Sequence, residues 1–269
     1  MRVRVGWKLL LTGPLFLAIL SGCPVPQRKP PPAPTAAESA AAAPHLGTPY
    51  QIVPQASLLT ILVYRGGALA SAGHNHVIAS HDLTGTIYVP SAILESSFEV
   101  HVPVDTLTVD EAALRAQQPA AEFPADVSES AKEGTRHNML GEALLDAQHN
   151  PEIVLRAVRL EHAGDAAAGS VTDSATVLAH VQSTVRGQVR TFTAPVRYLL
   201  TSDGTVEASG EFPLRQSELG LTPFSAMLGA LQVQDEMRVS FHIVAHSGKS
   251  VGRAGLNAAP VGVSARFAP

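Results

Sequence analysis

Between Tyr50 and His246 apolar residues recur at every second position, and this period constrains the fold more than any other feature of the sequence. In an extended chain successive side chains point to opposite faces, so each such segment reads as a strand with one buried face. The pattern therefore predicts an all-β fold. The segments that show it are 59–64, 83–89, 97–104, 153–160, 177–181, 192–198, 205–214 and 238–243.

About eight strands is the number at which an antiparallel sheet can close into a barrel that holds side chains or one small ligand. Hairpin turns are expected at Arg65-Gly66-Gly67, at Gly187 and at Ser202-Asp203-Gly204, because glycine supplies the left-handed conformation that tight turns need. No glycine-rich phosphate loop opens a helix, so nucleotide-binding folds are not supported.

One long segment, residues 110–147, departs from the period of two. A short helix is predicted from Asp110, where acidic residues favour a helix start, and helical turns are predicted from Glu129 to Ala147. Long insertions in compact domains are usually functional. We therefore expect this segment to cross one end of the barrel as a lid.

The N-terminus has the organisation of a bacterial lipoprotein signal. Basic residues precede an apolar run at residues 9–20, and Leu20-Ser21-Gly22-Cys23 follows as a lipobox. The run is too short for a comfortable transmembrane helix. We expect residues 1–22 to be removed and Cys23, the single cysteine of the chain, to carry the diacylglyceryl group and an acylated amine such as a palmitoyl amide.

Residues 23–48 are rich in proline and alanine and are expected to form a disordered tether about 75 Å long at full extension. The folded domain would span 49–246, and the tail 247–269 would again be disordered. Pro24 stands where an aspartate usually signals inner-membrane retention, so a lipid-anchored protein in the bacterial envelope, facing the periplasm from the outer membrane, is favoured. A net charge of -4 with no basic run argues against nucleic-acid binding.

Several short motifs occur in the order and spacing of a known family. The first two are Ser183-Thr184-Val185-Arg186-Gly187 with Arg190, and Arg215 with Leu219-Gly220-Leu221. The others are His137, Asp146 and Asn150-Pro151 before strand 152–160, together with Gly85-Thr86-Ile87 and Gln234-Asp235-Glu236-Met237.

With these motifs, residues 49–245 resemble the YceI-like, polyisoprenoid-binding domains, which are lipocalin-like antiparallel β-barrels of the bacterial periplasm. The resemblance implies an elongated apolar interior that takes a prenyl chain, such as an isoprenoid quinone. The chain departs from the family in the density of histidine at positions 74–81. It also has Leu144 and Leu145 where paired phenylalanines are common.

A prenyl ligand needs an apolar wall and little else, because each buried methylene contributes about 0.8 kcal/mol. Alternation places one set of large apolar residues on the inner face. The residues expected to line the interior are Ile61, Val63, Val100, Phe192, Tyr198, Phe212 and Phe241. The sequence equally allows these side chains to fill a solid barrel.

His74, His76 and His81 fall within eight residues. Alternation puts His74 and His76 on one strand face and His81 on the other. The pair could ligate Zn²⁺ or Cu²⁺ with His81 or His101 as a third ligand, or could hydrogen-bond the polar headgroup of a lipid. A structural or solvated role for these histidines is the simpler interpretation.

No catalytic constellation is present. Ser183 and His180 fall on opposite strand faces, and no nucleophile elbow occurs, so the chain is not expected to be an enzyme. Besides lipid binding and metal binding, the sequence allows a third function, that of a purely structural or stress-protective envelope protein. Such a protein would need no binding site. The sequence also allows a homodimer, through an exposed strand edge or the helical insertion.

Overall fold

A computed structural model of the chain describes residues 45–163 and 174–248. The expected signal peptide, Cys23, the tether up to residue 44 and the tail from residue 249 lie outside these residues. Strand β1 (Thr48–Ile52) begins one residue before the expected domain boundary, and the last strand runs one residue past it.

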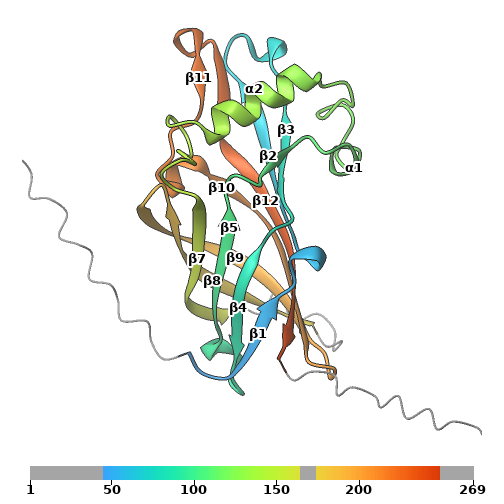
Figure 1. Cartoon of the computed structure of the whole chain (residues 1–269), viewed down its shortest axis with the longest axis vertical. Helices are drawn as coiled ribbons and strands as arrows, with labels where there is room; N and C mark the ends of the chain where they lie inside the picture. The colour runs from blue at the N-terminus through green and yellow to red at the C-terminus, as the bar shows by residue number, and fades with distance from the viewer. Residues whose placement is uncertain (1–44, 164–173, 249–269) are drawn as a thin grey trace, which may run out of the picture. The chain divides into compact units, whose positions relative to one another are not determined.

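Eight antiparallel strands form a closed ring in the order β1-β4-β5-β7-β8-β9-β10-β12, and β1 closes it by pairing with β12 (Figure 1). Besides β1, the strands of the ring are β4 (Thr84–Val89), β5 (Ser97–Pro103), β7 (Glu152–His162), β8 (Ser174–Val185), β9 (Gln188–Leu200), β10 (Thr205–Arg215) and β12 (Leu231–Ser247). The prediction of an all-β, lipocalin-like barrel of about eight strands is confirmed.

One of the eight strands predicted for the barrel does not belong to the closed ring, and another strand takes its place. The predicted strand at 59–64 is β2 (Leu58–Gly66), which lies outside the ring, while β1, which had not been predicted, lies within it. Both strands pair with the same edge of β12, one after the other, because β12 is 17 residues long. Beyond β2 the sheet continues through β3 (His76–Ser80) to β6 (Thr108–Val109), and β11 (Ser225–Ala226) pairs with the start of β12.

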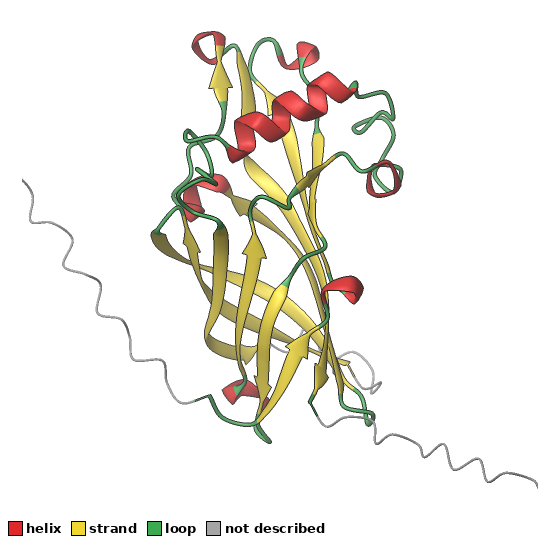
Figure 2. Ribbon diagram, in the orientation of Figure 1, coloured by secondary structure: helices red, strands yellow, loops and turns green. Residues whose placement is uncertain are grey.

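The insertion crosses the end of the barrel that we call the apex, as predicted (Figure 2). It contains α1 (Ala112–Arg115) and α2 (Glu129–Leu140). Helix α2 begins after Ser128, whose side chain accepts a hydrogen bond from the Ala131 amide, and ends at Gly141. No helix within residues 45–163 and 174–248 is long and apolar enough to span a membrane.

The hydrophobic core has three clusters. Two lie inside the barrel, around Val102 and around Phe212. The third packs the opposite face of β2 and β3 against Leu114 and Phe123 of the insertion. Strand β3 is therefore covered on both faces and all five of its residues are buried, which removes the alternation there. Within the described part of the chain, every residue of these clusters lies at Tyr50 or later, in the compact unit that begins at Pro44.

Gly85 is required by a close strand approach. Its φ is +134°, and a Cβ there would lie 2.0 Å from the carbonyl oxygen of Glu99 on β5. We expect Gly85→Ala to lower the free energy of unfolding by about 2 kcal/mol, measured by urea denaturation. The matched control is Gly134→Ala in α2, where a Cβ meets nothing within 4 Å. That control should stabilise by about 1 kcal/mol through helix propensity, and equal effects of the two substitutions would contradict the prediction.

Candidate functional site

The barrel is hollow along its length. A first cavity of about 210 Å³, which we call the base cavity, lies inside the barrel, where strands of the closed ring and Leu59 and Ile61 of β2 form its wall. Its wall is almost wholly aliphatic and aromatic, and its only polar groups are the hydroxyls of Ser96, Ser97, Ser183 and Tyr198. The interior is therefore an apolar hollow rather than a solid core.

A second cavity of about 410 Å³, which we call the apical cavity, lies beneath α2. The two cavities share Leu59, Ile61 and Met237 among their wall residues, so they adjoin. Most of the polar side chains that line the two cavities belong to the apical cavity. They are Arg65, His74, His76, Thr135, Asn138, Gln216 and Gln232. The combined space is apolar at the base and partly polar at the apex.

The residues predicted to line the interior all point into these cavities. Ile61, Val100, Phe192, Tyr198, Phe212 and Phe241 line the base cavity, and Val63 lines the apical one. The phenyl rings of Phe192 and Phe212 stack with their centroids 5.9 Å apart. Whether these residues bind lipid stays a prediction.

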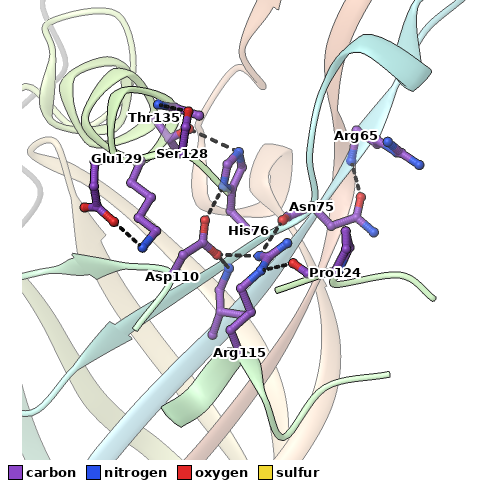
Figure 3. Close-up of polar contacts among 12 residues, drawn as sticks. Arg65, Asn75, His76, Asp110, Arg115, Pro124, Ser128, Glu129 and Thr135 are labelled. Atoms are coloured by element: carbon purple, nitrogen blue, oxygen red, sulfur yellow. Dashed lines mark hydrogen bonds and ion pairs between the residues drawn. The ribbon is translucent and has the colours of Figure 1, made fainter. Parts of the chain in front are cut away.

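A buried ion pair holds the apex together (Figure 3). Asp110 and Arg115 are 2% and 3% exposed, and Arg115 Nη1 donates to Asp110 Oδ1 at 2.6 Å. The same carboxylate accepts from the Val77 amide at 2.9 Å and from His76 Nδ1 at 2.7 Å. Arg115 also donates to the carbonyl oxygens of Asn75 and Pro124. These bonds fasten the insertion to β3.

The network continues to the lid. Thr135 of α2 places its hydroxyl oxygen 3.1 Å from Nε2 of His76. Since the other ring nitrogen of His76 donates to Asp110, this one histidine links α2 to the buried ion pair. Both His76 and Thr135 line the apical cavity, so the network forms part of the cavity wall.

The pKa of Asp110 lies below its usual value of 3.8. Burial by itself raises this pKa. The hydrogen bonds from His76 and the Val77 amide and the charge of Arg115 lower it by more than burial raises it. A carboxyl group with a lowered pKa in the folded state stabilises the fold above its unfolded pKa, and this contribution is lost as the pH falls through the folded pKa.

We therefore expect the free energy of unfolding of the wild-type domain to decrease as the pH falls below about 5. In Asp110→Asn, which does not titrate, the decrease should be smaller. Urea denaturation at a series of pH values measures both slopes. Parallel slopes would show that Asp110 makes no such contribution.

The three predicted histidines are not brought to one site. The rings of His74 and His76 lie 6.0 Å apart on the wall of the apical cavity, as alternation predicts. His81 instead faces Glu111 outside the cavity, with Nε2 3.0 Å from Oε1, and His101 lies between Glu99 and Glu152. Within the described part of the chain, no group of three or more His, Cys, Asp or Glu residues is placed to hold a metal ion.

Sequence reasoning did not identify the buried network of Asp110 and Arg115. The only signal was Asp110 itself, an acidic residue that begins the insertion, and it was assigned to a helix start. Its backbone has a φ of +55°, a conformation that aspartate tolerates better than most residues.

Ser183 and His180 fall on opposite faces of β8, as the alternation predicts. Ser183 lies in the wall of the base cavity, and His180 pairs with Glu161.

A search of curated proteins finds no match to this chain. Among solved structures, that of BcnA from Burkholderia cenocepacia has a TM-score of 0.50 and 15% identity, and the match covers 72% of this chain and 99% of that one. A polyisoprenoid binding domain from Saccharophagus degradans, implicated in plant cell wall breakdown, has a TM-score of 0.48 and 9% identity, with 74% and 98% covered.

The family comparison covers nearly the whole of the described domain. The sequence model of the YceI-like domain matches residues 50–245, from the first residue that pairs with β12 to one of the last residues of β12 itself. The match therefore includes the closed ring, both cavities and the insertion that covers them, and the chain belongs to the YceI-like family.

Proposed function

We propose that this protein binds an isoprenoid lipid, such as a prenylated quinone, inside its barrel. The observation that carries the proposal is the pair of adjoining cavities, almost wholly apolar at the base and partly polar beneath α2. Membership of the YceI-like family supports a binding protein rather than an enzyme.

The two cavities suit the two parts of such a ligand. A prenyl chain makes no directional contacts, and burial of each of its methylenes contributes about 0.8 kcal/mol. The base cavity, with Phe192, Phe212 and Phe241 in its wall, matches this chemistry. A quinone carbonyl needs hydrogen-bond donors. His74, Asn138 and Gln232 supply them at the apical cavity, so the headgroup would lie beneath α2.

The direct test is to identify what the protein carries. Residues 44–269 would be produced in a bacterial envelope, purified without detergent and measured by native mass spectrometry. We expect a bound mass that extracts into organic solvent as a prenylated compound. A phospholipid or fatty acid in its place would contradict the isoprenoid assignment, and a protein of bare chain mass would contradict lipid binding.

We further propose that the protein is anchored in the bacterial outer membrane through Cys23 and faces the periplasm. The lipobox at Leu20-Ser21-Gly22-Cys23, after an apolar run and a basic start, supports this. We expect labelled palmitate to be incorporated into the full chain and not into Cys23→Ser, and the wild type to fractionate with outer membranes. Incorporation into both proteins, or recovery of the wild type in the soluble fraction, would contradict the anchor.

A further inference from the structure

Two neighbouring loops at the apex carry large apolar side chains in solvent. They are residues 66–73, between β2 and β3, and residues 223–230, which run through β11 into β12; we call them together the apical tip. The Leu69 amide donates to the carbonyl oxygen of Ala230 at 2.8 Å, so the two loops form one surface. Leu69, Met227 and Leu228 are 42%, 69% and 109% exposed on it.

The tip has no charged residue. Residues 66–80 and 219–234 contain no Asp, Glu, Lys or Arg, although the chain as a whole has 16% charged residues. Arg65, at the edge of the tip, donates from Nη1 to the carbonyl oxygen of Gly73 at 2.8 Å. The exposed side chains of Leu69, Met227 and Leu228 carry no charge, so their insertion into a lipid bilayer does not require a charge to be desolvated.

The backbone projects the apolar side chains outward. Met227 and Leu228 have φ values of +52° and +55°, and neither residue type favours this left-handed conformation. Strained backbone of this kind points to a functional constraint when it coincides with an exposed feature. Here it coincides with Leu228, whose side chain is fully exposed.

The inner side of the tip is the wall of the apical cavity. Gly73, Phe224 and Leu231, at the bases of the two loops, line that cavity. Figure 1 shows β11 and the loop after β2 together at the end of the barrel away from β1. Any surface into which the tip inserts would therefore lie next to the apical cavity, where the headgroup of the proposed ligand would be held.

We propose that the apical tip inserts into the surface of a lipid bilayer and that lipid passes between bilayer and barrel at this end. The second half of this inference rests on the proposed function. A bilayer fits better than a protein partner, because three exposed side chains offer on the order of 400 Å², roughly half of what one partner contributes to a standard interface. Insertion of a few apolar side chains between lipids needs no such area.

The insertion can be followed with one fluorophore. The only tryptophan of the chain is Trp7, so residues 44–269 contain none, and Leu228→Trp makes the tip the only source of tryptophan emission. We expect this emission to shift to shorter wavelength on addition of phosphatidylcholine vesicles, and to do so at about 0.5 M salt, because the tip carries no charge. Val158→Trp, at a 57% exposed position on β7, is the matched control and should not shift.

A second pair of variants tests lipid passage. Met227→Asn with Leu228→Asn removes the apolar side chains, and asparagine tolerates the left-handed backbone, so the fold should persist. We expect vesicle affinity, and the initial rate of uptake of a prenylated quinone from vesicles, to fall about tenfold or more. The amount of lipid held at saturation should not change. Val158→Thr with Val189→Thr, at exposed apolar positions outside the two loops of the tip, is the control and should keep the wild-type rate.

The outcomes separate this inference from the proposed function. Leu228→Trp emission that ignores vesicles, in protein that carries extractable isoprenoid, would overturn the inference and leave the proposed function standing. Emission that shifts with vesicles in protein that carries no lipid would support the insertion and overturn the proposed function. A shift without vesicles that grows with protein concentration would assign the tip to a second copy of the chain and overturn the inference.

Discussion

Asp110→Ala is expected to lower the free energy of unfolding by about 3–5 kcal/mol, because it leaves the guanidinium of Arg115 buried without its counterion. The side chains of Asp110 and Arg115 are 0% and 3% exposed, so water does not replace the lost carboxylate. The substitution also removes the hydrogen-bond acceptor of His76 and of the Val77 amide. Alanine further disfavours the positive φ at this position.

Urea denaturation of residues 44–269 measures the effect, and an exposed pair of the same chemistry is the control. Arg238 Nη1 donates to Glu211 Oε1 at 2.7 Å, but both side chains are more than half exposed. Glu211→Ala should therefore cost less than about 1 kcal/mol. Similar losses for the two substitutions would show that burial of the Asp110 pair has no energetic consequence.

A double substitution separates the charge from the packing. In Asp110→Ala with Arg115→Met, no buried charge is left unpaired, so part of the lost stability should return. If the double variant is as unstable as the sum of the two single variants, the two groups act independently and the ion pair is not the cause. Asp110→Asn keeps a residue that tolerates the left-handed backbone and so isolates the loss of charge.

Ala194→Phe is expected to weaken lipid binding strongly while the domain stays folded. Ala194 lies on β9 opposite Ala179 of β8, is 3% exposed, and lines the base cavity. A phenyl ring there would occupy the space of about four methylenes of a prenyl chain, each contributing about 0.8 kcal/mol. The expected loss of affinity is therefore about 100-fold or more.

The measurements are the dissociation constant for a prenylated quinone, the lipid extracted from purified protein and the urea midpoint. Thr191→Phe, on the outward face of the same strand, is the matched control and should bind as the wild type does. Wild-type affinity in Ala194→Phe would show that the ligand lies elsewhere. If Ala194→Phe does not fold, Ala208→Phe on β10 adds the same ring to the same cavity from another strand.

Local pattern was enough to predict the fold class. Alternation of apolar and polar residues is a property of each strand by itself, so β4, β5 and β7 to β10 could be recognised without knowing their partners. The inward direction of Phe192, Phe212 and Phe241 followed from the same alternation. The helical insertion was recognisable because it breaks that period.

Ring closure could not be read from the sequence. Strand β1 is five residues long and β2 is nine, yet the shorter one closes the barrel, because the register of β12 brings Tyr50 opposite Ser247 and Leu58 opposite His242. The alternation of β3 was hidden for a related reason. Its second face is buried by Phe123, a residue more than forty positions away.

The sequence by itself determined that this chain forms an antiparallel barrel with an apolar inner face, because period and apolarity act between near neighbours. Only the tertiary structure decided that the barrel is hollow, that His81 lies apart from His74 and His76, and that Asp110 and Arg115 form a buried pair. The physical reason is that cavities, ion pairs and exposed tips depend on how volumes and charges from distant segments meet, and the spacing of residues along the chain does not contain that information.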